Sequence, residues 1–120
     1  MLFRSSGTVT LAGDLALEDG AALAFNWTLA RTVPRIALAS GKTLTLGDGK
    51  QLKVEVSSTC GKLHGGEHLL TDCDGGFADA SLSIVLDGDD DAAQWVKEVF
   101  VKGGEIVVEN KRLGMVVILL

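Results

Sequence analysis

The chain has 120 residues, 47% of them hydrophobic, and a formal net charge of −5. This length suits a single domain over residues 1–120 with a modest core, and the hydrophobic content excludes a disordered chain. The acidic balance argues against nucleic acid or an anionic membrane as a partner, because no cationic stripe is present to displace their counterions.

Apolar residues recur at every second position through most of the chain, which is typical of β-strands with one face on a core. In chain order, the predicted strands cover residues 9–11, 15–17, 23–29, 36–38, 44–46, 52–56, 82–86 and 106–108. Asp-Gly and Gly-rich pairs separate these runs, and both residue types tolerate the left-handed backbone of tight turns. The sequence therefore predicts an all-β fold.

A repeat relates two of these regions. The segments 15–25 and 44–54 share the pattern L-x-L-x-D-G-x-x-L-x-[FV], with Leu44 standing 29 positions after Leu15. A period of this length with a strand–turn–strand signature predicts one rung of a short β-solenoid, similar to a parallel β-helix. The alternative is a β-sandwich in which the two segments are ordinary hairpins.

Two segments depart from simple alternation. Residues 89–100 begin with acidic residues and continue with helix formers, which predicts one short helical turn leading into a strand. Its apolar face would contain Ala92, Trp95, Val96, Val99 and Phe100. The C-terminal residues 115–120 are apolar and β-branched but far too short to span a bilayer, so we expect a buried final strand and no membrane span.

Several segments resemble the passenger regions of autotransporters, which are β-helical surface or secreted proteins of Gram-negative bacteria. Residues 7–25 resemble one of their rungs, and the last third resembles their C-terminal portion. The residues that carry this second resemblance are 68–70, Gly76-Phe77, Trp95, 104–108 and 113–117. The resemblance implies a secreted or cell-surface module, and it implies no particular activity, because such proteins include adhesins, proteases and inert stalks. The segment between the two cysteines is not part of the usual pattern.

Cys60 and Cys73 bracket a polar, glycine-rich segment. A disulfide between them would close a short loop and imply an extracytoplasmic compartment, whereas two thiols or metal ligation are the alternatives. With His64 and His68 they form the pattern C-x3-H-x3-H-x4-C, a set of four ligands suited to zinc. The simplest interpretation of both histidines is nevertheless exposed loop residues.

Carboxylates also gather here. Asp72, Asp74 and Asp79 offer oxygen ligands for calcium, although no complete EF-hand loop is present. Asp72 and Asp74 are also the candidate catalytic pair of an aspartic-type acid peptidase acting on extracellular glycoproteins such as mucin. The simplest interpretation is that these acids mark turns.

The combined prediction is a secreted or cell-surface β-rich module with a structural or adhesive role. Its partner would be an extracellular protein or glycan, it would need no cofactor, and it would be a monomer or a homodimer. The first residues lack the apolar stretch of a signal peptide. The acid peptidase and a zinc- or calcium-binding surface module remain as the alternative functions.

Overall fold

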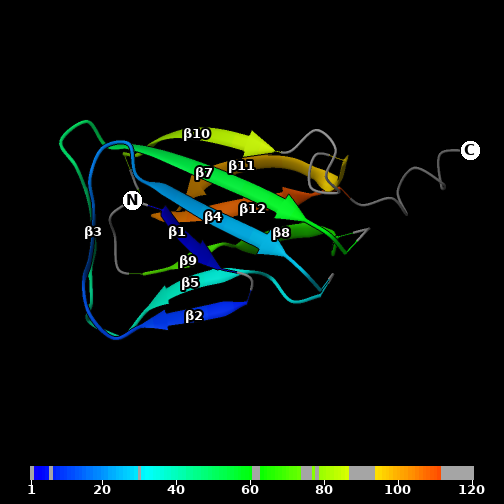
Figure 1. The fold of residues 1–120 in the computed structure, drawn as a ribbon, viewed down its shortest axis with the longest axis horizontal. Coiled ribbons are helices and arrows are strands. Elements are labelled where there is room, and N and C mark those ends of the chain that lie inside the picture. The colour runs from blue at the N-terminus through cyan, green and yellow to red at the C-terminus, as the bar shows by residue number, and fades with distance from the viewer. Residues whose placement is uncertain are drawn as a thin grey trace, which may run out of the picture.

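The computed structural model describes residues 2–5, 7–29, 31–60, 63–73, 77, 79–86 and 94–111. Twelve strands are described within these ranges (Figure 1). They are β1 (Leu2–Ser5), β2 (Thr8–Leu11), β3 (Leu15–Leu17), β4 (Ala22–Trp27), β5 (Arg35–Leu38), β6 (Leu44–Leu46), β7 (Gln51–Ser58), β8 (Gly66–Leu69), β9 (Thr71–Asp72), β10 (Ser81–Leu86), β11 (Val96–Lys102) and β12 (Glu105–Asn110). The all-β prediction is confirmed.

Successive strands join different sheets, so that the chain forms a coil. The first sheet has the order β1-β4-β7-β10, the second β2-β5-β9 and the third β3-β6, and every pairing in them is parallel. Each of the first two turns of the coil contributes one strand to each sheet. Parallel pairing between consecutive turns is the arrangement of a β-solenoid, so of the two predicted forms the structure has the solenoid and not the sandwich.

One end of the coil is covered by antiparallel strands. β11 and β12 form a hairpin, and β12 pairs with β8. β8 and β9 are separated only by Leu70, whose carbonyl accepts a hydrogen bond from Ile36 N and whose N–H donates to Ile106 O. The run 66–72 therefore has β5 on one side and β12 on the other. The second parallel sheet thus continues into the antiparallel hairpin.

The sequence repeat corresponds to adjacent turns, with one change of register. Leu15 pairs with Leu44 as the 29-residue period predicts, whereas Leu23 pairs with Val54, 31 positions later. The second turn holds two additional residues between its paired positions. Since side chains alternate with a period of two, a shift of two keeps the same residues facing inward.

Inward-facing side chains stack from turn to turn to make the core. Leu23 lies beside Val54, and both are fully buried, while Phe25 lies beside Val56 in the next row. Trp27 is the largest fully buried side chain. Residues of all three parallel sheets and of β12 belong to this one hydrophobic cluster. Burial of these apolar surfaces is the main favourable term in the stability of the coil.

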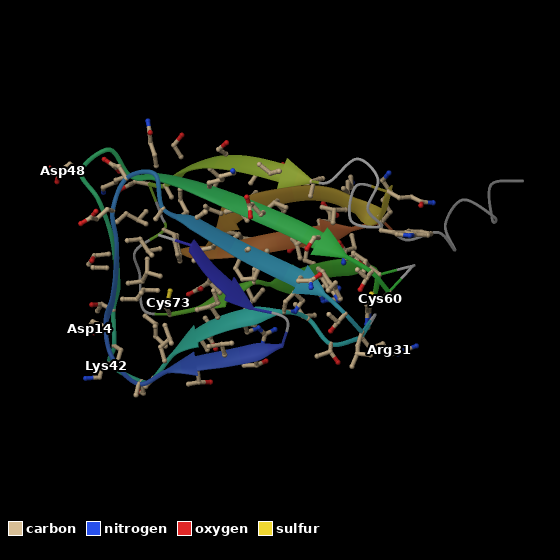
Figure 2. The ribbon with its side chains drawn as sticks, in the orientation of Figure 1. Asp14, Arg31, Lys42, Asp48, Cys60 and Cys73 are labelled. Atoms are coloured by element: carbon tan, nitrogen blue, oxygen red, sulfur yellow. The ribbon has the colours of Figure 1, made fainter. Side chains whose placement is uncertain are left out.

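Acidic side chains connect neighbouring turns of the coil at its corners. Asp19-Gly20 lies in a tight turn, as the Asp-Gly pair predicted. The carboxylate of Asp19 accepts hydrogen bonds from Gly49 N at 2.8 Å and from Gln51 N at 3.4 Å. The Asp14 carboxylate accepts one from Thr43 N at 2.9 Å. A Cβ on Gly47 would lie 2.7 Å from Asp19 N, so this corner fits closely only with glycine. Figure 2 shows Asp14, Lys42 and Asp48 along one side of the coil, where β3 lies in Figure 1.

The predicted helical turn is partly wrong. Val96, Val99 and Phe100 lie in β11, and only Gln94 and Trp95 among the described residues are helical in that region. Pairing with β12 outweighs the local helical preference. Leu29, predicted in a strand, lies beyond β4 and is 64% exposed. The predicted C-terminal strand at 115–120, Ala92 and the acidic run 87–91 lie outside the described residues. In the described part of the chain, no helix has the length and apolar character needed to cross a membrane.

Candidate functional site

The most strongly connected polar cluster joins the parallel coil to the antiparallel hairpin. Glu105 begins β12, directly after the turn at Gly103–Gly104, and its carboxylate meets the end of β9. Thr71 Oγ1 donates a hydrogen bond to Glu105 Oε2 at 2.7 Å and accepts one from Ile106 N at 2.9 Å. Cys73 N donates to Glu105 Oε1 at 3.0 Å. One carboxylate therefore fixes the hairpin turn against β9.

This environment changes the acidity of Glu105. Burial raises the pKa of the Glu105 carboxyl above its ordinary value of 4.5 because the charged form loses solvation, and the nearby Asp72 carboxylate adds to the rise. Hydrogen bonds from the Cys73 amide, the Thr71 hydroxyl and the Cys73 thiol act in the opposite direction but are outweighed. Both carboxylate oxygens already accept hydrogen bonds from the protein, so the Glu105 side chain holds β12 against the end of β9.

Cys60 and Cys73 are not joined by a disulfide, contrary to one of the predictions. Cys60 follows the end of β7, and Cys73 follows β9, so the two lie near opposite ends of the strands (Figure 2). Between them the chain runs extended from Gly66 to Asp72, at about 3.3 Å per residue. A disulfide needs Cα atoms within about 7 Å, and this extended run keeps the two cysteines much farther apart.

The two cysteines have separate polar environments. The Cys60 sulfur lies 3.3 Å from Ser58 Oγ, and the Cys73 sulfur lies 3.8 Å from Glu105 Oε2. Both side chains are half-buried. Two separate thiols do not indicate an oxidising compartment as a disulfide would.

The histidines lie together without the cysteines. The rings of His64 and His68 have centroids 5.0 Å apart, and His68 also meets the edge of Trp27. His68 Nε2 lies 2.9 Å from His64 O and 3.1 Å from Gly65 O. Because both partners are carbonyl oxygens, this nitrogen carries the proton and donates. His64 is exposed in its loop, as predicted, whereas His68 is half-buried in β8.

The four predicted zinc ligands are not brought together, and one of the predicted calcium ligands, Asp74, lies outside the described residues. Cys73 lies at the other end of the strands from Cys60, so the four zinc ligands do not converge (Figure 2). Among the described residues, no group of three or more His, Cys, Asp or Glu side chains is placed to hold a metal ion. Asp79 is exposed and pairs with Lys50 at 3.3 Å.

Only one member of the candidate catalytic pair lies among the described residues. Asp72 ends β9 and is exposed, and Asp74 lies outside the described residues. The carboxyl group whose pKa is shifted at this position is that of Glu105, which sequence reasoning did not identify. Glu105 lies 34 residues after Thr71, and a Glu following Gly-Gly has the sequence signature of an ordinary exposed hairpin turn. No local pattern in the sequence distinguishes it.

A groove of about 330 Å³ lies on the outer face of the antiparallel sheet. Its lining residues are Glu67, His68, Leu69, Lys102 and Val107. Leu69 and Phe100 pair with Val107 from opposite sides, so the three form one apolar row across the sheet. Leu69 is 39% exposed, and the ion pair of Lys102 with Glu67, at 3.0 Å, lies beside the row. The groove therefore offers an apolar floor with both charge signs at its rim.

A second hollow of about 290 Å³ lies on the first parallel sheet. Its lining is mainly small or polar, with two leucines that are buried or half-buried: Gly20, Gln51, Leu52, Lys53, Ser81, Leu82 and Ser83. It lacks the exposed apolar side chain that distinguishes the groove on the antiparallel sheet.

No family model, curated protein or solved structure matches the chain.

Proposed function

We propose that the chain is an extracytoplasmic β-solenoid module with a structural and adhesive role. The observation that supports this most is the coil itself. Aliphatic side chains stack in its interior, Asp19 and Asp14 connect its corners, and a hairpin covers the end of its second sheet. Such a stack holds its outer faces at fixed positions, which suits a scaffold that presents a binding surface.

The groove on the antiparallel sheet is the adhesive surface of this proposal. Leu69 and Val107 provide apolar contact, and the Glu67 and Lys102 side chains provide an acceptor and a donor at its rim. Sugar rings present one apolar face and a margin of hydroxyls, so a glycan of an extracellular glycoprotein has chemistry complementary to this groove. The extracytoplasmic setting follows from the resemblance of the rungs to autotransporter passengers.

The test is binding of the intact chain to immobilised mucin, measured by biolayer interferometry. Leu69→Glu removes apolar contact from the groove and places a third charge there, so we expect at least about a tenfold weaker affinity. Leu29→Glu is the matched control, because Leu29 is 64% exposed and lies outside the groove lining. The control should bind as the unmodified chain does.

Two results would contradict the proposal. Absence of mucin binding by the unmodified chain would remove the adhesive role, and equal loss in both variants would remove the groove as its site. Cleavage of mucin at acidic pH that is lost in Asp72→Asn would instead identify the chain as an acid peptidase.

A further inference from the structure

Within the described part of the chain, β10 is an edge strand of the first parallel sheet. Among the described strands it is hydrogen-bonded to β7 alone, and Figure 1 shows it at the margin of that sheet. Its sequence, Ser81–Leu86, contains no charged residue and no proline. Edge strands normally carry such residues, because an unpaired row of N–H and C=O groups invites pairing with another chain.

The edge strand of the antiparallel sheet, in contrast, carries charged residues that oppose pairing with another chain. β11 lies at the margin of the antiparallel sheet and carries Lys97, Glu98 and Lys102. Lys97 and Lys102 form ion pairs with Glu109 and Glu67 of the same sheet. The absence of charge on β10 is therefore not a general property of the edges in this molecule.

The apolar ladder of the core also remains open at β10. Leu82, Ile84 and Leu86 pair with Leu52, Val54 and Val56, and these three β7 residues are at most 2% exposed. Ile84 continues the stack of Leu23 and Val54, yet it is 37% exposed. Val85, on the opposite face of the strand, is 40% exposed. A strand added at this edge would cover apolar surface on both faces of the sheet.

We propose that the β10 edge pairs with the β10 edge of a second copy of this chain, forming a homodimer. Antiparallel pairing about a two-fold axis at Ile84 sets Ile84 opposite its own copy and Leu82 opposite Leu86. The inward ladder then faces a matching ladder, and no charge lies within either paired strand. The two four-stranded sheets become one continuous sheet.

The pairing has a characteristic salt dependence. Each copy carries a net charge of −5, so the copies repel each other, while the contact itself is uncharged. Added salt screens the repulsion and leaves the apolar contact and the main-chain hydrogen bonds in place. The dimer should therefore become stronger as ionic strength rises.

Sedimentation velocity of the full chain over a range of concentrations tests this inference. We expect a species of twice the 12.6 kDa chain mass, with Val85→Lys raising its dissociation constant at least about tenfold. Leu29→Lys, at an exposed position outside β10, is the control and should remain dimeric. Far-ultraviolet spectra verify that each variant folds, and Ser83→Lys on the same outer face replaces Val85→Lys if that variant does not.

The contrary outcomes are distinct. A chain that is monomeric at all concentrations overturns the proposal. A dimer that is as strong in Val85→Lys as in the Leu29→Lys control, or that weakens with salt, overturns it too. A monomer that dimerises only after removal of residues 112–120 would show that this chain's own terminus occupies the edge. None of these outcomes depends on the mucin-binding groove, because Leu69 and Lys102 lie on a different sheet.

Discussion

At the scale of single residues, buried polar contacts determine where the hairpin meets the coil. Thr71 is 1% exposed, and its hydroxyl serves both the Glu105 carboxylate and the Ile106 amide. A buried donor or acceptor that loses its partner is costly, so each member of this cluster depends on the others. Glu105 is the member whose charge changes with pH.

Glu105→Gln should change how stability depends on pH. Because burial raises the pKa of the Glu105 carboxyl, the folded state binds this proton more tightly than the unfolded state does. The stability that Glu105 contributes is therefore complete at pH values below its unfolded pKa of about 4.5 and is lost as the pH rises through the raised pKa. Glutamine does not titrate.

Urea unfolding of both proteins across this pH range measures the effect. As the pH falls from neutral, the unfolding free energy of the unmodified chain should increase relative to that of the variant. A difference that stays constant, or that grows in favour of the unmodified chain with rising pH, would contradict the assignment.

Gly47→Ala should destabilise the chain, because its new Cβ would lie 2.7 Å from the backbone nitrogen of Asp19. Backbone cannot move aside as a flexible side chain can, so we expect a loss of about 1–3 kcal/mol in unfolding free energy. Gly13→Ala is the control, since no atom lies within 4 Å of its Cβ position. Equal midpoints of thermal unfolding for the two variants would show that the corner is not closely fitted.

At the scale of elements, alternation and turn residues predicted most strands of the coil. The runs at 15–17 and 44–46 match β3 and β6 without change, and the run at 82–86 matches β10 except for its first residue, Ser81. The start of β11 at Val96 could not be predicted, since Val96 and Val99 suit one face of a helix as well as a strand, and the pairing with β12 that decides between them is a tertiary contact. The register of β4 on β7 could not be predicted from the sequence either, because it depends on how Asp19 fits against the turn at Gly47 and Gly49.

Thr71→Val should weaken the connection between β9 and β12. Valine keeps the shape of threonine but leaves Ile106 N and Glu105 Oε2 without the hydroxyl, so we expect a loss of about 1–3 kcal/mol. Thr45→Val on β6 is the matched control, since Thr45 is exposed. Urea unfolding measures both, and an equal effect of the two substitutions would exclude a special role for Thr71.

The candidate site was less predictable than the strands. His64 and His68 do meet, but Cys60 and Cys73 lie apart, because the extended run 66–72 crosses the coil between them. The groove on the antiparallel sheet has no sequence signature, since Leu69, Phe100 and Val107 become neighbours only through strand pairing. Spacing along the chain therefore predicted the strands well and the side-chain clusters poorly.

For the molecule as a unit, every outer surface depends on one property: the chain coils and does not fold back into hairpins around Asp19-Gly20. Leu15 pairs with Leu44, Leu23 with Val54 and Val54 with Ile84, each in parallel orientation. The outer faces, the corner connections and the open β10 edge all depend on this winding. A sandwich of the same strands would place different residues on its surface.

Nuclear Overhauser contacts between backbone protons test the winding directly. We expect parallel-strand contacts linking Leu23 with Val54 and Val54 with Ile84. Strong contacts between the α-protons of residues 15–17 and those of residues 22–24 would reveal an antiparallel hairpin at Asp19-Gly20 and would contradict the coil.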